Sequence, residues 1–184
     1  MKHHVCPWWV GYFLMSPLRR IYNNPEKILN SYVREGMNVL EVGPGMGFFS
    51  ITLARCVGKS GRVYCIDVQE KMLRSLCRRA QKANVMDRLE VRLCSDTSLQ
   101  IDDLINTIDF TLAFAVVHEV PAQDNLFREL YSALKKNGLL LMAEPKNHVT
   151  DKAYRTSIAI AESSGFRIEG TPAIPKNYSA LLVK

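Results

Sequence analysis

The run of residues 39–47 constrains the fold of this chain more than any other segment. It reads as a short apolar strand that ends in glycines at every second position, Gly43, Gly45 and Gly47. An apolar helical pattern begins at Phe48, directly after the last glycine. Glycine allows positive φ and lets another group come close to the backbone. The order of strand, glycine loop and helix therefore predicts either a ligand site at a helix N-terminus or, on the simpler reading, a tight turn without a ligand.

Three further predicted strands end in polar or small residues. Residues 61–67 end in Asp67, twenty positions after Gly47. An acid at this place in a dinucleotide-binding type of unit accepts hydrogen bonds from ribose hydroxyls. Residues 89–94 lead into Ser95-Asp96, and residues 108–114 lead into Ala115 and the His118-Glu119 pair. Ligands of open α/β sheets bind at the carboxyl ends of the strands, so this edge is the expected site.

The loop spacing is G-x-G-x-G, with Glu41 just before the first glycine, rather than the G-x-G-x-x-G of nicotinamide and flavin proteins. Together with the strand ends, this pattern over residues 30–184 resembles class I S-adenosylmethionine (SAM)-dependent methyltransferases. The resemblance implies an α/β fold with a Rossmann-like seven-stranded sheet of order 3-2-1-4-5-7-6, strand 7 antiparallel and helices on both faces. It implies an enzyme with SAM as cofactor, bound by Glu41, Gly43, Gly45, Gly47, Asp67, Val68, Asp96, Thr97 and Ala115.

The remaining pattern predicts alternating strands and helices. Strands are expected at 37–42, 62–67, 89–94, 108–114, 139–143, from 166, and at 178–183. Helices are expected from Asn24-Pro25 to about Gly36, and at 47–57, 69–83, from Pro121 and at 150–164, with Gly138 as a helix cap. The short loop 171–177 predicts that the last two strands form an antiparallel hairpin.

Composition narrows the class of protein further. A chain of 184 residues with 47% hydrophobic content suffices for one domain, predicted over 24–184, with a single core. Five cysteines without a C-x-x-C pair argue against a disulfide framework and fit a reducing cytoplasm. No apolar run is long enough to span a membrane.

The net charge of +6 is typical of nucleic-acid-binding proteins, but the positions of the basic residues argue against a nucleic-acid partner. Four of the basic residues lie at helical spacing and predict one solvated helix face, opposite apolar residues. No aromatic residues interleave these charges as base-stacking platforms would. The expected partner is a small-molecule acceptor, while the sequence leaves the oligomeric state open.

The first 23 residues are apolar and aromatic, and three interpretations stay open. They form a lid over the methyl group, a segment packed on the core, or an interfacial anchor. As a lid, the segment places Cys6, Trp9 and Tyr12 in the substrate pocket, together with Lys146. The residues His3-His4 and Cys6 either bind a metal or metalloid or belong to a solvated terminus, which is the favoured interpretation; no resident metal is expected.

Catalytic residues are harder to predict, because methyl transfer needs mainly positioning and exclusion of water. His118 is expected to serve as a general base and Glu119 to assist, unless the histidine only bonds its own loop. The segment 144–148 is a second candidate or a polar loop. Residues 115–118 lack the [N/D]-P-P-[Y/F] motif of amino-methylating enzymes, which leaves O, S, C and metalloid acceptors.

Among methyltransferases, the chain resembles the small group that contains ubiquinone/menaquinone C-methyltransferases and arsenite methyltransferases. Three alternatives to small-molecule methylation remain. They are a SAM-binding module without turnover, a methyltransferase that acts on RNA or protein, and a nucleotide-linked redox enzyme.

Overall fold

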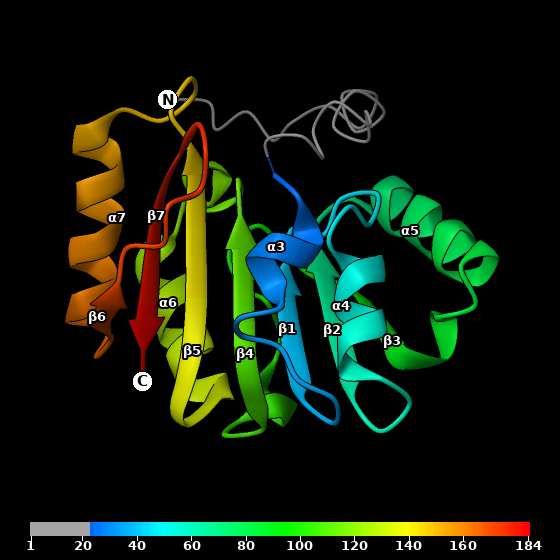
Figure 1. Ribbon diagram of the computed structural model, residues 1–184. Coiled ribbons are helices and arrows are strands. Elements are labelled where there is room, and N and C mark those ends of the chain that lie inside the picture. Colours follow the sequence, from blue (N-terminus) through cyan, green and yellow to red (C-terminus); the bar gives the residue numbers. More distant parts are fainter. Residues whose placement is uncertain (1–22) are drawn as a thin grey trace. The chain divides into compact units, whose positions relative to one another are not determined.

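The computed structural model describes residues 23–184, which fall into two compact units, 23–93 and 94–184 (Figure 1). The strands pair in the order β3-β2-β1-β4-β5-β7-β6, and β7 is antiparallel to both of its neighbours. This is the order that the resemblance implied, so the predicted α/β fold class is confirmed. Beyond this order, each unit is described by itself.

The N-terminal unit alternates strands with helices. Its elements are α3 (Pro25–Leu29), β1 (Asn38–Val42), α4 (Ser50–Val57), β2 (Arg62–Asp67), α5 (Glu70–Lys82), the short helix η1 (Met86–Arg88) and β3 (Leu89–Leu93). Its three strands are parallel, with β2 between β1 and β3. Since parallel strands start at the same edge, β1 and β2 also end at the same edge, where the glycine loop and Asp67 lie.

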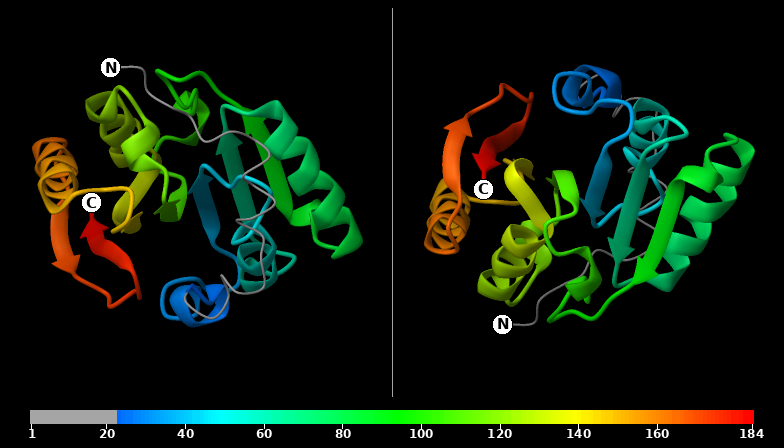
Figure 2. Two further views of the ribbon diagram at one scale, coloured as in Figure 1. Left: turned by 90° about the horizontal axis from the view of Figure 1, so that it is seen from above. Right: turned by 90° about the horizontal axis from the view of Figure 1, so that it is seen from below.

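α4 and α5 pack on the same face of these strands (Figure 2), as two successive right-handed crossovers between neighbouring parallel strands require. The predicted two-faced pattern of α5 is confirmed. Its exposed basic residues are Lys71, Arg74, Arg78 and Lys82. Its buried residues include Met72, Leu73, Leu76 and Ala80. The unit's core forms where these apolar side chains meet the buried strands.

The prediction for α3 is only half right. Asn24 caps the helix as expected, since its side chain accepts a hydrogen bond from the Lys27 amide. The helix, however, ends at Leu29 rather than near Gly36. After the end of α3, the Arg34 side chain donates to backbone carbonyls, with Nη1 2.6 Å from the Asn30 carbonyl oxygen. The Gly36 amide donates to the Val57 carbonyl oxygen at 2.9 Å, so a tertiary contact rather than a helical turn holds this segment.

The C-terminal unit places two helices against the longest strands. Its elements are η2 (Asp102–Leu104), β4 (Ile108–Phe114), η3 (Val117–Glu119), α6 (Gln123–Ala133), β5 (Leu134–Pro145), α7 (Asp151–Ser163), β6 (Arg167–Gly170) and β7 (Asn177–Val183). β4 and β5 are parallel, whereas β5, β7 and β6 pair antiparallel, which confirms the hairpin. α6 and α7 lie side by side (Figure 2).

Gly138 is not a helix cap, contrary to the prediction. α6 ends at Ala133, and β5 runs from Leu134 through Gly138. The reason is close packing: a Cβ on Gly138 would lie 2.9 Å from the Lys135 carbonyl oxygen and 3.0 Å from the Leu134 side chain. The glycine therefore serves an irregular start of the strand, where the pairing register with β4 shifts.

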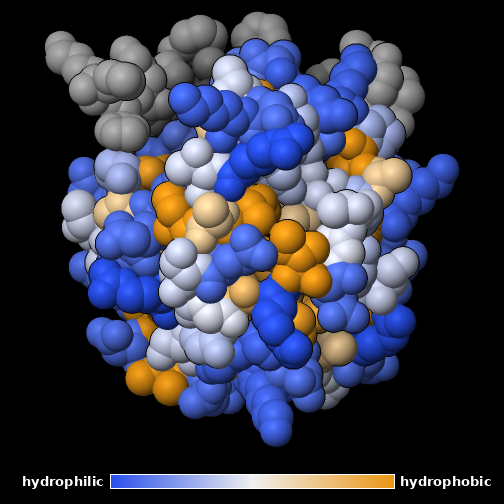
Figure 3. Space-filling view, turned by 90° about the vertical axis from the view of Figure 1, so that its left-hand side faces the viewer, coloured by the Kyte–Doolittle hydropathy of each residue, from blue (hydrophilic) through white to orange (hydrophobic). Residues whose placement is uncertain are grey.

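The side of the C-terminal unit that carries α7 and β6 shows apolar side chains among charged ones (Figure 3). Ile168 of β6 is 48% exposed there. A groove of about 480 Å³ between α6 and α7 is lined by Asp124, Arg128, Thr156, Ala159, Ile160, Ser163 and Ser164. The polar side chains of this lining are engaged within their own helices: Asp124 pairs with Arg128, and the three hydroxyls donate to helix carbonyls. The candidate chemistry is found at the strand ends instead.

Candidate active site

The glycine loop after β1 has the backbone geometry that its sequence predicts. Gly43, Gly45 and Gly47 have φ of 65°, 56° and 85°, a region that other residues adopt only at a cost. A Cβ on Gly47 would lie 3.2 Å from the Leu76 side chain, which shows how closely α5 packs on the loop. A Cβ on Gly45 would meet no atom of residues 23–184 within 4 Å, so among these residues this side of the loop has room for a ligand.

Asp67, at the end of β2, is joined to this loop. Its Oδ2 accepts a hydrogen bond from the Gly45 amide at 3.1 Å, and its Oδ1 accepts one from the Gln69 amide at 2.9 Å. Burial raises the pKa of the carboxyl, and the bonds from Gln69, Gly45 and Val68 oppose that rise. Val68 beside it is 38% exposed. The structure thus brings Asp67 and the middle glycine of the loop together, as the sequence order alone does not.

Glu41 is directed into the unit rather than toward solvent. It is 3% exposed. Its Oε2 accepts hydrogen bonds from Ser50 Oγ at 2.5 Å and from Cys65 Sγ at 3.7 Å. Burial, followed by the Glu41 charge, raises the pKa of the Cys65 thiol well above its usual value, which keeps this donor protonated. These contacts tie β1 to the first turn of α4 and to β2, so they fix the loop between them.

Arg79 holds the loop from the α5 side, a contact that sequence reasoning missed. Its Nη1 donates to the Met46 carbonyl oxygen at 2.6 Å. Arg79 is half-buried, whereas its neighbour Arg78 lies on the exposed face of α5. The one sequence signal for this role is that Arg79 lies next to, but outside, the helically spaced series of exposed basic residues on α5.

In the C-terminal unit, Asp96 and Thr97 are exposed on a loop that α6 holds. Asn125 Nδ2 donates to the Thr97 carbonyl oxygen at 2.8 Å. The Glu129 carboxylate accepts from Ser98 Oγ at 2.6 Å and from the Leu99 amide at 2.7 Å. The sequence predicted the loop but not these two anchors, which have no motif.

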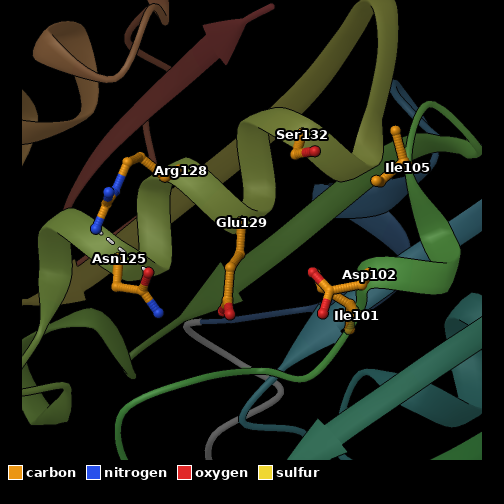
Figure 4. A pocket seen from close by; sticks show the side chains of 7 residues that line it. All are labelled: Ile101, Asp102, Ile105, Asn125, Arg128, Glu129 and Ser132. Carbon is orange, nitrogen blue, oxygen red and sulfur yellow. Dashed lines mark hydrogen bonds between the residues drawn. The ribbon is translucent and has the colours of Figure 1, made fainter.

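Figure 4 shows a small pocket of about 180 Å³ beside α6, into which the Glu129 side chain extends. It is lined by Ile101, Asp102, Ile105, Asn125, Arg128, Glu129 and Ser132. Because Glu129 already accepts two hydrogen bonds from the loop of residues 95–99, it acts in this pocket as a structural anchor.

The end of β4 carries a strained residue and the predicted histidine. Ala115 has φ of 57°, which is uncommon for alanine, and its amide donates to the Ala143 carbonyl oxygen at 2.7 Å. η3 follows, with His118 27% and Glu119 22% exposed at their side chains. Strained backbone of this kind clusters at functional sites. The structure thus places Ala115, His118 and Glu119 on one short segment.

His118 is paired with Glu144, the buried residue near the end of β5. Nδ1 of His118 and Oε2 of Glu144 are in hydrogen-bond contact, and Glu144 is 1% exposed. Burial lowers the pKa of His118, but the bond to Glu144, its charge and the charge of Glu119 outweigh burial and raise it. The His148 ring stacks on the His118 ring at 6.5 Å between centroids. A histidine bonded to a buried carboxylate has the chemistry of an acid–base centre.

Lys146 lies beyond Pro145 at the same end of β5 and is exposed. Its Nζ is 5.1 Å from the centroid of the Tyr178 ring, and Tyr178 stacks on Tyr154 at 5.1 Å. Burial, followed by the Glu144 charge, raises the pKa of Tyr154 to about 12. Lys146 therefore forms a cation–π contact at this strand end, next to an aromatic pair.

The other predicted residues lie outside the described part of the chain. These are Cys6, Trp9 and Tyr12, together with His3 and His4. Between residues 23 and 184, no three histidine, cysteine or acidic side chains gather as a metal site would require. Nor does any helix in that range have the length and apolar composition that crossing a membrane requires.

Comparison with known proteins gives the class. The family described as "Methyltransferase domain" matches residues 33–169, so the chain belongs to this family. A SAM-dependent methyltransferase from Aquifex aeolicus has a similar structure, with a TM-score of 0.86, 26% identity, and coverage of 97% of this chain and 98% of that one. The chain is therefore a class I SAM-dependent methyltransferase.

Two further proteins are informative. The ubiquinone/menaquinone biosynthesis C-methyltransferase UbiE of Escherichia coli (strain K12 / DH10B) is 31% identical over 62% of this chain and 45% of its own length. The chain thus spans less than half the length of the curated relatives it matches. Aeropyrum pernix fibrillarin, solved with natively bound SAM, shares the fold at a TM-score of 0.66 and 18% identity, over 83% of this chain and 68% of that one.

Proposed function

We propose that this protein transfers a methyl group from SAM to a small-molecule acceptor that must lose a proton. The observation that carries this proposal is the His118–Glu144 pair. A methyltransferase whose acceptor is already a free nucleophile has no need of a base. A partly exposed histidine bonded to a buried carboxylate is suited to taking a proton near neutral pH.

For the cofactor, the residues of the N-terminal unit fit the group. Gly45 leaves space that a side chain would fill, and Asp67 presents a carboxylate bonded to that same glycine. We propose that Asp67 binds the ribose hydroxyls and that the loop from Gly43 to Gly47 lies against the amino-acid end. When bound, SAM supplies a methyl group on a positively charged sulfur. By resemblance, Val68, Asp96, Thr97 and Ala115 complete the contacts.

For Glu41 we propose a supporting part. Its carboxylate bonds Ser50 and Cys65, so it fixes the loop that receives the cofactor. This explains why an acid stands two residues before the first glycine. A buried carboxylate that accepts such bonds keeps β1, β2 and α4 in a fixed geometry, and preorganised loops bind ligands at lower entropic cost.

For the acceptor we propose a carbon acid, phenol or thiol. Nε2 of His118 would take the acceptor's proton as the acceptor atom bonds to the methyl carbon and the bond between that carbon and the SAM sulfur breaks. Carbon is the favoured atom, since UbiE is named as a C-methyltransferase of quinone biosynthesis. Within residues 23–184, the thiols of Cys56, Cys65 and Cys77 form no disulfide, which supports a place in the cytoplasm.

We further propose that residues 1–23 act as the lid of the active site and that residues 24–184 form the methyltransferase domain. The family fold needs a cover that excludes water during transfer. Deletion of residues 1–15 is expected to leave SAM binding intact and to abolish transfer. Full activity of the truncated chain would assign this segment to packing or docking instead.

The function is tested by turnover. The full chain and SAM carrying a labelled methyl group are incubated with quinols, phenols, thiols and carbon acids, and labelled products are identified by mass spectrometry. We expect one of these classes to be methylated. SAM binding without any methylated product would identify a SAM-binding module without turnover. Methylation confined to RNA or protein would overturn the small-molecule assignment.

A further inference from the structure

Glu144 makes three hydrogen bonds with one short segment of the chain. Its Oε1 lies 3.2 Å from the Val116 amide nitrogen and 2.9 Å from the Val117 amide nitrogen, while its Oε2 contacts Nδ1 of His118. With 1% of its surface exposed, the carboxylate has little contact with solvent. A buried carboxylate is stable only when strong hydrogen bonds compensate for its lost hydration. Here the groups that bond it lie on the turn that bears His118.

The arrangement of these donors fixes which nitrogen of His118 carries the proton. Two amide N–H groups point at Oε1, as they would toward an ionised acceptor. The second oxygen then accepts from Nδ1, so that Nδ1 is the donor in the neutral imidazole. Nε2 is left with its lone pair. Its nearest acidic neighbour is Glu119, whose Oε1 is 4.0 Å away.

The turn itself is held in place from two helices. Gln123 of α6 donates from Nε2 to the Val117 carbonyl oxygen at 3.0 Å, and its Oε1 accepts from Ser157 Oγ of α7 at 2.7 Å. Val117 is fully buried. Glu144 thus accepts from the two backbone amides before His118, and Gln123 donates to the Val117 carbonyl oxygen. These bonds hold the backbone that bears the imidazole in one position.

We propose that Glu144 is the positioning residue of the reaction: it holds His118 in the tautomer that carries the proton on Nδ1 and directs the Nε2 lone pair to the acceptor's proton. This inference rests on the proposed function, in which His118 is the base. Glu144 itself exchanges no proton with the acceptor. When Nε2 takes the acceptor's proton, the carboxylate stabilises the imidazolium that forms, as the acid of a hydrolase triad does.

Other ionisable groups also lie near the His118–Glu144 pair. Glu119 of η3 faces Nε2 and favours the protonated ring. Tyr154 of α7 is influenced by the Glu144 charge and stays neutral, with a pKa of about 12. His148, beyond β5, stacks on the ring. Of these neighbours, Glu144 is the one bonded to an imidazole nitrogen of His118, so it sets the tautomer.

The test is Glu144→Gln in the full chain. A glutamine keeps an oxygen for the Val116 and Val117 amides and turns its NH₂ toward Nδ1 of His118. The ring then has to accept at Nδ1 and carry its proton on Nε2. We expect kcat to fall by about 10²–10⁴-fold, the loss that follows removal of a general base. The dissociation constant of SAM should not change.

Two readouts separate positioning from a structural role. Long-range ¹H–¹⁵N NMR of neutral His118 should show the proton on Nδ1 in the wild type and on Nε2 in Glu144→Gln. The double variant Glu144→Gln, His118→Gln should be no slower than His118→Gln alone, because Glu144 acts through the histidine. A purely structural carboxylate would instead add its own loss to that of His118.

The matched control is Glu129→Gln, which also removes a carboxylate that accepts from a backbone amide in this unit. It should leave the His118 tautomer as in the wild type. A wild-type His118 protonated on Nε2 would overturn the proposal even if Glu144→Gln failed to fold. Failure of the wild type to bind SAM would instead overturn the proposed function, so the two failures are distinguishable.

Discussion

The two units of this chain place their functional groups by different means. In the N-terminal unit the backbone itself forms the candidate site: three glycines with positive φ stand beside an aspartate that bonds the middle one. In the C-terminal unit the candidate chemistry depends on one pair of side chains, His118 and Glu144. A backbone site needs glycine at set positions, so it leaves a pattern in the sequence. A side-chain pair needs only two suitable residues that the fold brings together, and it leaves none.

The strongest expected effect separates the two regions by function. His118→Ala should lower kcat by about 10²–10⁴-fold, because the acceptor's proton loses its base. The SAM affinity should stay the same, since His118 is not among the residues proposed to contact the cofactor. Steady-state kinetics and calorimetry on the same preparation measure both. The rising limb of the pH–rate profile should vanish with the imidazole; a variant that keeps this limb would mean that His118 is structural.

A smaller effect is expected at the arginine that supports the glycine loop. Arg79→Ala removes a hydrogen bond from a charged donor to the Met46 carbonyl, worth about 1.5–3 kcal/mol when buried and less here, where it is partly exposed. The free energy of unfolding, measured with urea, should fall together with SAM affinity.

Its neighbour provides the control for this measurement. Arg78→Ala removes the same charge from the exposed face of α5. It should change neither the free energy of unfolding nor SAM affinity, because exposed charges contribute little. Equal effects of the two variants would show that net charge, and not the loop contact, matters.

The smallest effect concerns the pH dependence of stability. The pKa of His118 is raised in the folded chain, so its pairing with Glu144 stabilises the fold fully below the unfolded pKa of about 6.5. This contribution is lost as pH rises through the higher folded pKa. The difference in unfolding free energy between wild type and His118→Gln should therefore shrink from pH 5 to pH 9. A difference that stays constant or grows with pH would contradict the pairing.

Much of the fold was predictable because its signals are local. β2 and β4 have the predicted bounds at 62–67 and 108–114, since short apolar runs bounded by turn residues define buried strands. Two of the errors come from tertiary contacts. α3 stops early where Gly36 bonds Val57, and Gly138 is needed for close packing inside β5 rather than as a cap.

The candidate site divides in the same way. Glycine spacing and strand ends are local features of the sequence, and they are enough to indicate the loop, Asp67 and His118 as candidates. The pairings were not predictable. Arg79 and Glu129 belong to no motif, Glu144 was indicated only as part of the candidate segment 144–148, and each acts on a residue 26 to 33 positions away. Only the packed chain decides which polar side chain satisfies which backbone group.

Calorimetric titration of the full chain with SAM tests the central claim most directly, with wild type and Asp67→Ala measured side by side. We expect the wild type to bind SAM and the variant to lose about 1.5–3 kcal/mol of binding free energy, the scale of a hydrogen bond to a charged acceptor. This corresponds to roughly 10- to 150-fold weaker binding. No binding of SAM or S-adenosylhomocysteine by the wild type at millimolar ligand, or equal affinity of the two chains, would contradict it.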